Sequence, residues 1–292
     1  MCIRDRPVRG RSCSSNAIPF LTKKFATYDA FAKATLPEIY TENHLQDSFQ
    51  VEATVAQSIL LINDGQDMAT MSFDKLLSEL YSSQSIQPLL CVAIHAGPER
   101  RMEYGTQLIP DYKNRGIKAA LYNRFIFDEL LPLAEEAYNN GSRFMEKAFA
   151  GCSLGGLSAL DIVWNRPVEF TKAGVFSGSL WWRSMDQDDP GYDDEQHRIM
   201  HQQIRKGKYA PWLKFFIQCG NMDETKDRNK NGIIDSIDDA QDLIKELVEK
   251  GYDPENDIYY HEMPDGHHDV STWGRAMPEF LKWGWGIANH SK

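Results

Sequence analysis

The sequence predicts a single α/β domain built on a mostly parallel central sheet with helices on both faces. From Ser58 onward, short apolar runs alternate with longer segments whose apolar residues recur at helical spacing. The runs are nearly continuous rather than alternating, as in parallel strands covered on both faces. With 292 residues, 42% of them hydrophobic, the chain can bury a sizeable core, and no linker or internal repeat divides it.

Six strands and five helices follow from this pattern. The predicted strands cover residues 58–63, 88–96, 147–152, 173–178, 213–220 and 257–263. The predicted helices cover residues 73–83, 119–138, 154–164, 239–251 and 272–285. Gly141 and Gly251 stand where helix ends are expected.

The first 57 residues are patterned less clearly. The opening MCIRDR resembles the translation of a transposon-derived sequencing adapter, so we expect residues 1–13 to be an artefactual leader from metagenomic assembly. Residues 14–57 are expected to add edge elements to the same domain, because residues 49–57 alternate like an antiparallel strand. Residues 58–292 then form the catalytic part.

Charge and composition restrict the partners. The formal net charge of −10 argues against nucleic acid, whose binding needs an excess of clustered Lys and Arg. No apolar run is long enough for a membrane helix, and no signal peptide is visible. We therefore expect a soluble, cytoplasmic protein, with a secreted or periplasmic origin as the alternative because the leader is artefactual. Cys91, Cys152 and Cys219 lie in or at the ends of predicted strands and are expected to be reduced.

The stretch GCSLGG, residues 151–156, joins a predicted strand to a predicted helix, which is the context of a nucleophile elbow. Such a turn would lift the Ser153 hydroxyl above the sheet, and the Leu154 N–H would face a developing oxyanion. A second oxyanion N–H is expected from Gly65 or Gln66, after the first strand. A glycine-rich turn without catalysis gives the same pattern, so the interpretation depends on a base and an acid farther along the chain.

An acid and a base follow in the required order. The fold demands serine, then acid, then histidine. Asp223 and Glu224 follow the fifth strand, and Asp223 is favoured because a shorter side chain holds an imidazole more rigidly. His267 and His268 follow the last strand, and spacing alone does not choose between them.

Five motifs in order, LLINDGQD, GCSLGGLSALD, FSGSLWW, CGNMDE and GHHDVSTW, resemble the putative esterase family of α/β-hydrolases, relatives of esterase D and the enterochelin esterases. The resemblance runs from about residue 60 to 285. It implies an α/β-hydrolase fold and a serine carboxylester hydrolase of small-molecule or carbohydrate esters, without an organic cofactor. It also implies Ser153 as nucleophile, Asp223 as acid and His268 as base, since the family's histidine stands five residues before a tryptophan, here Trp273.

The family places an aromatic pair after the SGS turn, matched here by Trp181 and Trp182. Adjacent tryptophans are costly to expose, so they either wall an acyl or sugar pocket or pack under the acidic segment 186–195, itself expected to be a solvated loop. The loop after the second strand carries Arg100, Arg101, Glu103 and Tyr104, which are expected either to line the cleft or to form a surface salt-bridge cluster.

Residues 227–238, DRNKNGIIDSID, match a calcium loop of EF-hand type, with Asp at the last position instead of the usual Glu. The expected ligands are the side chains of Asp227, Asn229, Asn231, Asp235 and Asp238, and the backbone carbonyl of Ile233. A helix is expected to follow from Asp239. Calcium would then hold the loop that presents Asp223 and act structurally.

The resulting prediction is an esterase that works through an acyl-enzyme. One alternative is an acyltransferase that passes the same acyl group to an alcohol or sugar. The other is a non-catalytic, calcium-dependent carbohydrate-binding protein on a hydrolase scaffold. The sequence indicates neither the acyl group, the alcohol nor the oligomeric state.

Overall fold

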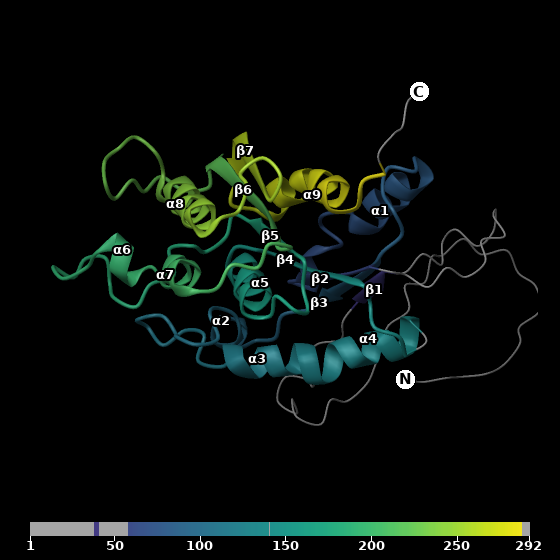
Figure 1. Ribbon diagram of the computed structural model, residues 1–292. Helices are drawn as coiled ribbons and strands as arrows, with labels where there is room; N and C mark the ends of the chain where they lie inside the picture. The colour runs from purple at the N-terminus through teal and green to yellow at the C-terminus, as the bar shows by residue number, and fades with distance from the viewer. Residues whose placement is uncertain (1–37, 41–57, 140, 288–292) are drawn as a thin grey trace, which may run out of the picture.

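A seven-stranded sheet forms the centre of the computed structural model, which describes residues 38–40, 58–139 and 141–287 (Figure 1). The strand order is β1-β3-β2-β4-β5-β6-β7. Strands β2 to β7 run parallel to one another, and the short β1 (Glu38–Tyr40) pairs antiparallel with β3 at the edge. The predicted mostly parallel sheet is therefore confirmed. Residues 1–37 and the expected strand at 49–57 lie outside the described residues.

All six predicted strands are present. They are β2 (Ser58–Asn63), β3 (Leu90–Ile94), β4 (Glu146–Cys152), β5 (Lys172–Phe176), β6 (Lys214–Met222) and β7 (Ile258–His267). Strand β7 continues four residues beyond its predicted end, because its pairing with β6 resumes after an irregularity near Gly220. At that point Gly266 packs against Gly220 so closely that a Cβ on it would lie 2.8 Å from the Gly220 Cα. The extension places His267 inside the strand.

The five predicted helices are also present, with shifted ends. The helical segments are α1 (Phe73–Ser82), η2 (Gly65–Asp67), α2 (Arg100–Glu103), α3 (Ala119–Phe125), η3 (Ile126–Leu130), α4 (Leu131–Tyr138), α5 (Leu154–Asn165), α6 (Asp194–His197), α7 (Ile199–Lys206), α8 (Asp235–Lys250) and α9 (Val270–Trp285). The predicted helix 119–138 contains the π-helical turn η3 just before Pro132, which has no N–H to donate to the helical ladder. The segment 186–195 is not entirely a loop, since α6 begins at Asp194.

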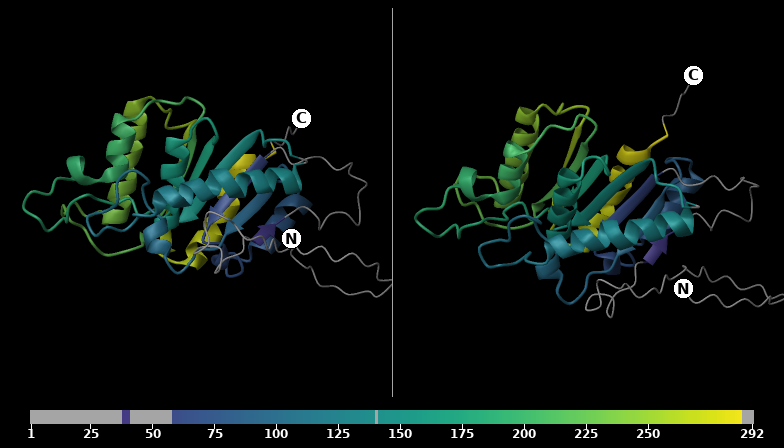
Figure 2. Two further views of the ribbon diagram at one scale, coloured as in Figure 1. Left: turned by 90° about the horizontal axis from the view of Figure 1, so that it is seen from below. Right: turned by 60° about the horizontal axis from the view of Figure 1, so that its bottom comes forward.

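The two faces of the sheet have separate hydrophobic cores. Side chains at alternate strand positions, such as Leu60 and Leu61, belong to different cores, as the alternation along a strand requires. One core includes α1 and α9, and the other includes α3, α4, α5, α7 and α8. Figure 2 shows the long α3–α4 segment crossing one face, with α9 on the opposite face. Coverage on both faces explains the continuous apolar runs in the sequence.

The three cysteines of the described chain are buried and unpaired, as their positions in predicted strands indicate. Cys91, Cys152 and Cys219 are buried free thiols, and burial raises the pKa of all three.

Within the described part of the chain, no helix has both the length and the apolar character needed to cross a membrane.

Candidate active site

Ser153 stands in the turn between β4 and α5, at the carboxyl end of the parallel strands. Its φ of 54° and ψ of −121° are unusual for a residue with a side chain. The Ser153 N–H donates to the Phe176 carbonyl (2.8 Å), which ties this backbone to β5. Strained backbone of this kind persists only where the surrounding structure holds it, and it is common at active sites.

The glycines around Ser153 allow β4 and α5 to approach each other. A Cβ on Gly151 would lie 2.4 Å from the Gly155 carbonyl oxygen, and one on Gly156 would lie 2.8 Å from the Gly151 oxygen. A Cβ on Gly155 would lie 2.6 Å from Asp64 Oδ2, at the loop that follows β2. Each glycine is therefore required by a close contact with backbone or with a buried carboxylate.

His268 reaches Ser153 from the end of β7. Its Nε2 lies 2.9 Å from the Ser153 Oγ, within hydrogen-bonding distance. The imidazole stands edge-on to Trp273, with ring centroids 5.2 Å apart, and Trp273 Nε1 donates to the Ser177 Oγ (3.0 Å). The first turn of α9 therefore fixes the histidine ring. The neighbouring His267 ends β7, and both histidines are exposed.

Asp223 lies at the end of β6, on the adjacent strand. Its Oδ2 accepts a hydrogen bond from the Gly220 N–H (3.1 Å). Its Oδ1 is buried and has no hydrogen-bond partner among the described residues. The negative charge of Asp223 acts to raise the pKa of His268. No hydrogen bond joins the two side chains in the described structure.

The pKa of His268 is lowered overall. Partial burial of the ring is the largest cause, Arg100 adds to it, and the carboxylates of Asp223 and Asp269 act in the opposite direction. A lowered pKa keeps the imidazole neutral at neutral pH, and only the neutral form can accept the serine proton.

Two helix starts meet beside Ser153. The first N–H groups of η2, at Gly65 and Gln66, and of α5, at Leu154, have no partner within their own helices. The segments are in contact, because Asn63 Nδ2 donates to the Gly155 carbonyl (2.8 Å). The Gln66 side chain accepts from the Ala96 N–H, which holds the turn after β2 in place.

Sequence reasoning missed an ion pair at this turn. Arg100 binds Asp64 through two hydrogen bonds, Nε to Oδ1 at 2.6 Å and Nη2 to Oδ2 at 2.7 Å, and lies over the Tyr104 ring at 5.0 Å. Asp64 is 2% exposed, so the arginine neutralises a buried carboxylate next to Gly155. Nothing in the sequence indicates that Asp64 adopts a left-handed backbone conformation, with a φ of 62°.

Four residues predicted to bind substrate differ in how far they are exposed to solvent. Arg101 is exposed, whereas Glu103 is 3% exposed, and burial together with the charge of Glu99 raises its pKa to about 7. Trp181 is half-buried, whereas Trp182 is fully buried. Trp182 packs against loop 104–118, where a Cβ on Gly105 would lie 2.6 Å from its ring. The aromatic pair is therefore divided between a surface position and the core.

Replacing Arg100 tests its electrostatic effect on His268. In Arg100→Met we expect the acid limb of the kcat/KM profile to move to higher pH, because removing a nearby positive charge makes the imidazole easier to protonate. The control is Arg101→Met, which removes the same charge from an exposed neighbour. An acid limb that coincides in the two variants, or that moves to lower pH in Arg100→Met, would contradict this assignment.

The predicted calcium loop forms its turn. Asp227 accepts from the N–H groups of Asn231 (3.1 Å) and Gly232 (2.9 Å), and Gly232 has a φ of +87°. Asn231 Oδ1 accepts from the Ile233 N–H (2.8 Å). These hydrogen bonds give the sharp bend that the glycine predicts.

The interior of this loop does not fit a calcium ion as it stands. The Nδ2 groups of Asn229 and Asn231 both donate to Asp238, whereas calcium takes oxygen ligands. Asp235 accepts from the Arg228 N–H (2.8 Å). Helix α8 begins at Asp235 instead of Asp239, which places Asp235 and Asp238 in its first turn. Among the described residues, no group of three or more His, Cys, Asp and Glu side chains could hold a metal ion.

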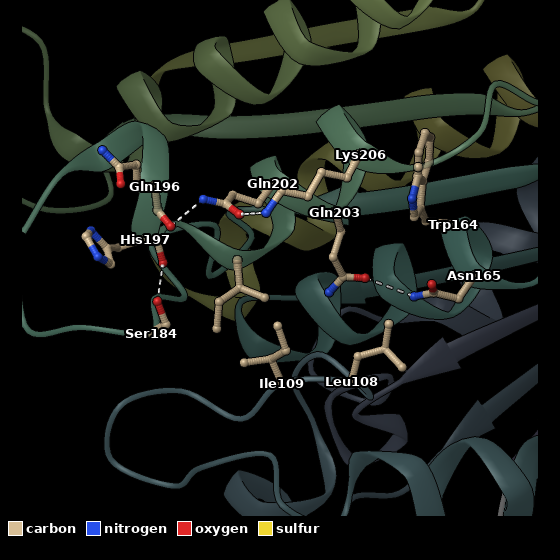
Figure 3. A pocket seen from close by; sticks show the side chains of 12 residues that line it. Leu108, Ile109, Trp164, Asn165, Ser184, Gln196, His197, Gln202, Gln203 and Lys206 are labelled. Atoms are coloured by element: carbon tan, nitrogen blue, oxygen red, sulfur yellow. Dashed lines mark hydrogen bonds between the residues drawn. The ribbon is translucent and has the colours of Figure 1, made fainter.

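A cavity of about 360 Å³ lies at the far end of α5 from Ser153 (Figure 3). Leu108 and Ile109 form one wall, and Trp164 and Asn165 lie at the carboxyl end of α5. Asn165 Nδ2 donates to Gln203 on α7 (3.2 Å). Ser153, Asp223 and His268 do not line this cavity, so it is separate from the candidate active site.

Comparison with known proteins places the chain among esterases. A family model described as putative esterase matches residues 37–283. Protein YbbA of Bacillus subtilis (strain 168) is 27% identical over 128 residues, which cover 42% of this chain and 50% of that protein.

Solved structures show the same fold. The enterobactin esterase of Shigella flexneri has a TM-score of 0.59 at 20% identity, covering 85% of this chain and 54% of that chain. The BES protein from Bacillus cereus has a TM-score of 0.64 at 15% identity, covering 97% of this chain and 100% of that chain. The chain thus spans about half the length of YbbA and of the Shigella esterase.

Proposed function

The chain belongs to the putative esterase family of α/β-hydrolases, and from this premise we propose that it is a serine carboxylester hydrolase. The observation that carries the proposal is the 2.9 Å distance between Ser153 Oγ and His268 Nε2 at a strained strand-to-helix turn. A serine hydroxyl becomes nucleophilic only beside a general base, and this geometry supplies one.

The first half-reaction forms an acyl-enzyme. Neutral His268 takes the proton from Ser153 as the oxygen attacks the ester carbonyl. The N–H groups of Leu154 and of Gly65 or Gln66 stabilise the oxyanion, because both belong to helix starts with free donors. Asp223 stabilises the imidazolium, which then gives its proton to the leaving alcohol.

The second half-reaction transfers the acyl group. Water activated by His268 attacks the acyl-Ser153, which releases the acid and restores the enzyme. An alcohol or a sugar hydroxyl in the place of water would make the protein an acyltransferase. Product analysis separates these outcomes: with an added alcohol acceptor, an esterase gives mainly the free acid, whereas a transferase gives mainly the new ester.

The substrate is proposed to be a small-molecule or carbohydrate ester. Similar structures are named enterobactin esterase, ferulic acid esterase and siderophore hydrolase, that is, two esterases and one hydrolase by name. Trp181, half-buried at the end of the SGS turn, supports an aromatic or sugar-bearing substrate. A panel of p-nitrophenyl esters of increasing acyl length, with feruloyl and acetyl-sugar esters, would define the class.

The acid is tested by comparing two adjacent carboxylates. Asp223→Asn is expected to lower kcat by about 10⁴-fold, because the imidazole loses the partner that fixes its tautomer. Glu224→Gln provides the matched comparison, since it makes the same change one residue later. A larger loss in Glu224→Gln, measured with the same ester, would assign the acid to Glu224 instead.

Calcium binding at residues 227–238 stays a prediction, and the mechanism above does not depend on it. The turn hydrogen bonds of Asp227 favour it, but both Asn amides would have to rotate to present oxygen. Calcium at 100 times its Kd would stabilise the fold by about 2.7 kcal/mol and raise the Tm by about 5–10 °C. A Tm that calcium leaves unchanged after chelator treatment would contradict the prediction, and the rise should be absent in Asp238→Asn.

A further inference from the structure

The Trp181 pocket, a second cavity of about 230 Å³, is not lined by Ser153, Asp223 or His268, but two of its lining residues follow active-site residues closely in the chain. Trp181, on its wall, stands two residues after Ser179, whose Oγ is 3.5 Å from the Ser153 Oγ. Glu224, also on its wall, directly follows Asp223. The pocket is therefore built partly from the two loops that also carry Ser179 and Asp223.

The pocket is rich in positive charge. Its lining includes Lys113, Arg115, Arg183, Lys226 and Arg228. Only two carboxylates, Glu224 and Asp235, accompany them in the lining. This local excess contrasts with the net charge of −10 on the whole chain. A concave surface lined mainly by cations attracts anions and raises their local concentration.

Two of the arginines that line the pocket, Arg115 and Arg228, form ion pairs with neighbouring carboxylates. Arg115 forms a salt bridge with Asp111 and lies over the Trp181 ring at 4.8 Å. Arg228 binds Asp194 (3.0 Å) and Asp239 (2.6 Å). Their charges are largely neutralised, so they fix the shape of the pocket and the position of the indole.

The remaining cations form no close ion pair. Within the part of the chain that the structure describes, Lys113, Arg183 and Lys226 form no salt bridge, and Lys113 and Lys226 are exposed. The charges of Lys113 and Arg183 contribute to lowering the pKa of Asp186, and the charge of Lys226 acts in the same direction on the pKa of Glu224. Arg183 donates from Nη1 to Gln187 (2.6 Å) and lies over the Tyr192 ring at 5.7 Å, and its Nε–H is buried with no acceptor among the described residues. A buried arginine donor without an acceptor is costly, and an oxyanion is its best-suited partner.

We propose that the Trp181 pocket binds an anionic group of the ester substrate, a carboxylate or another oxyanion, through Arg183, Lys113 and Lys226. Trp181 packs against the neighbouring aromatic or apolar part of the same molecule. The inference rests on the proposed esterase function and adds a charge preference to it.

Pairs of esters in which one member carries a carboxylate and the other a neutral group in its place test this preference. On the acyl side, the mono-p-nitrophenyl ester of adipate is compared with p-nitrophenyl hexanoate, in which a methyl group replaces the carboxylate. On the alcohol side, 4-acetoxybenzoate is compared with its methyl ester. The measured quantity is the ratio of kcat/KM values, anionic over neutral, after subtraction of spontaneous hydrolysis.

In the wild type we expect the anionic ester to be preferred in at least one pair by about fivefold to tenfold at low salt. The double variant Lys113→Met/Lys226→Met, and separately Arg183→Met, should bring that ratio close to one, as should 0.5 M salt. Lys75→Met on α1, which removes an exposed charge from the opposite face of the sheet, should leave the ratio at its wild-type value.

Different results would count against the anionic site and against the esterase function. Hydrolysis of the neutral esters with a ratio of one or less in both pairs would overturn the anionic site but leave the esterase function intact. A wild-type preference that survives unchanged in all the pocket variants would also overturn it. Failure to hydrolyse any of the esters would instead count against the esterase function itself.

Discussion

Replacing Ser153 with alanine is expected to lower kcat for ester hydrolysis by about 10⁶-fold. The acyl-enzyme cannot form without the hydroxyl, and the residual rate would come from the oxyanion donors and from substrate binding. The fold should be retained, because alanine occupies the same backbone without new contacts. The measurements are the kcat for a p-nitrophenyl ester and the Tm of the variant beside that of the wild type.

Ser179 provides the control, because its Oγ lies only 3.5 Å from that of Ser153. No histidine accepts a hydrogen bond from Ser179 in the described structure. Ser179→Ala should therefore lose far less activity than Ser153→Ala. An equal loss in the two variants, with both folded, would contradict the assignment of Ser153 as the nucleophile.

His268→Ala is expected to reduce kcat about as strongly as the loss of the serine, because the two groups act as one unit. His267→Ala removes the neighbouring ring, which has no hydrogen bond to Ser153 in the described structure, and should change kcat by no more than about twofold. The same ester assay measures both. A large loss confined to His267→Ala would show that the wrong histidine of the pair had been assigned.

The proposed nucleophile and acid could be predicted because parallel strands gather their carboxyl ends at one edge of the sheet. Apolar runs located β4, β6 and β7, and that placement alone brought Ser153 and Asp223 to the same edge. The choice of His268 over His267 came from the resemblance to a family. The structure adds the physical reason, since β7 extends through His267 and only His268 is free to turn toward the serine.

Other features depend on contacts that periodicity does not record. The pairing of Asp64 with Arg100, 36 residues later, requires a left-handed residue after β2 that the sequence does not mark. Trp181 and Trp182 are adjacent in sequence, yet the glycines of loop 104–118 bury only the second.

The predicted calcium loop illustrates a different limit. The same Asp and Asn residues that match a calcium motif by spacing can satisfy one another through amide-to-carboxylate hydrogen bonds. The spacing of residues in the motif determines which side chains lie in the loop. It does not determine whether an Asn side chain turns its nitrogen or its oxygen toward the middle of the loop. Helix α8 also starts four residues earlier than the motif implied, so two expected ligands belong to a helix.

Covalent labelling with a fluorophosphonate tests whether Ser153 is an activated nucleophile, because the reagent reacts with an activated serine and needs no knowledge of the natural ester. We expect one label per chain on the peptide that contains Ser153, lost in Ser153→Ala and strongly slowed in His268→Ala. A folded wild-type protein that remains unlabelled, or a label that persists in Ser153→Ala, would contradict it.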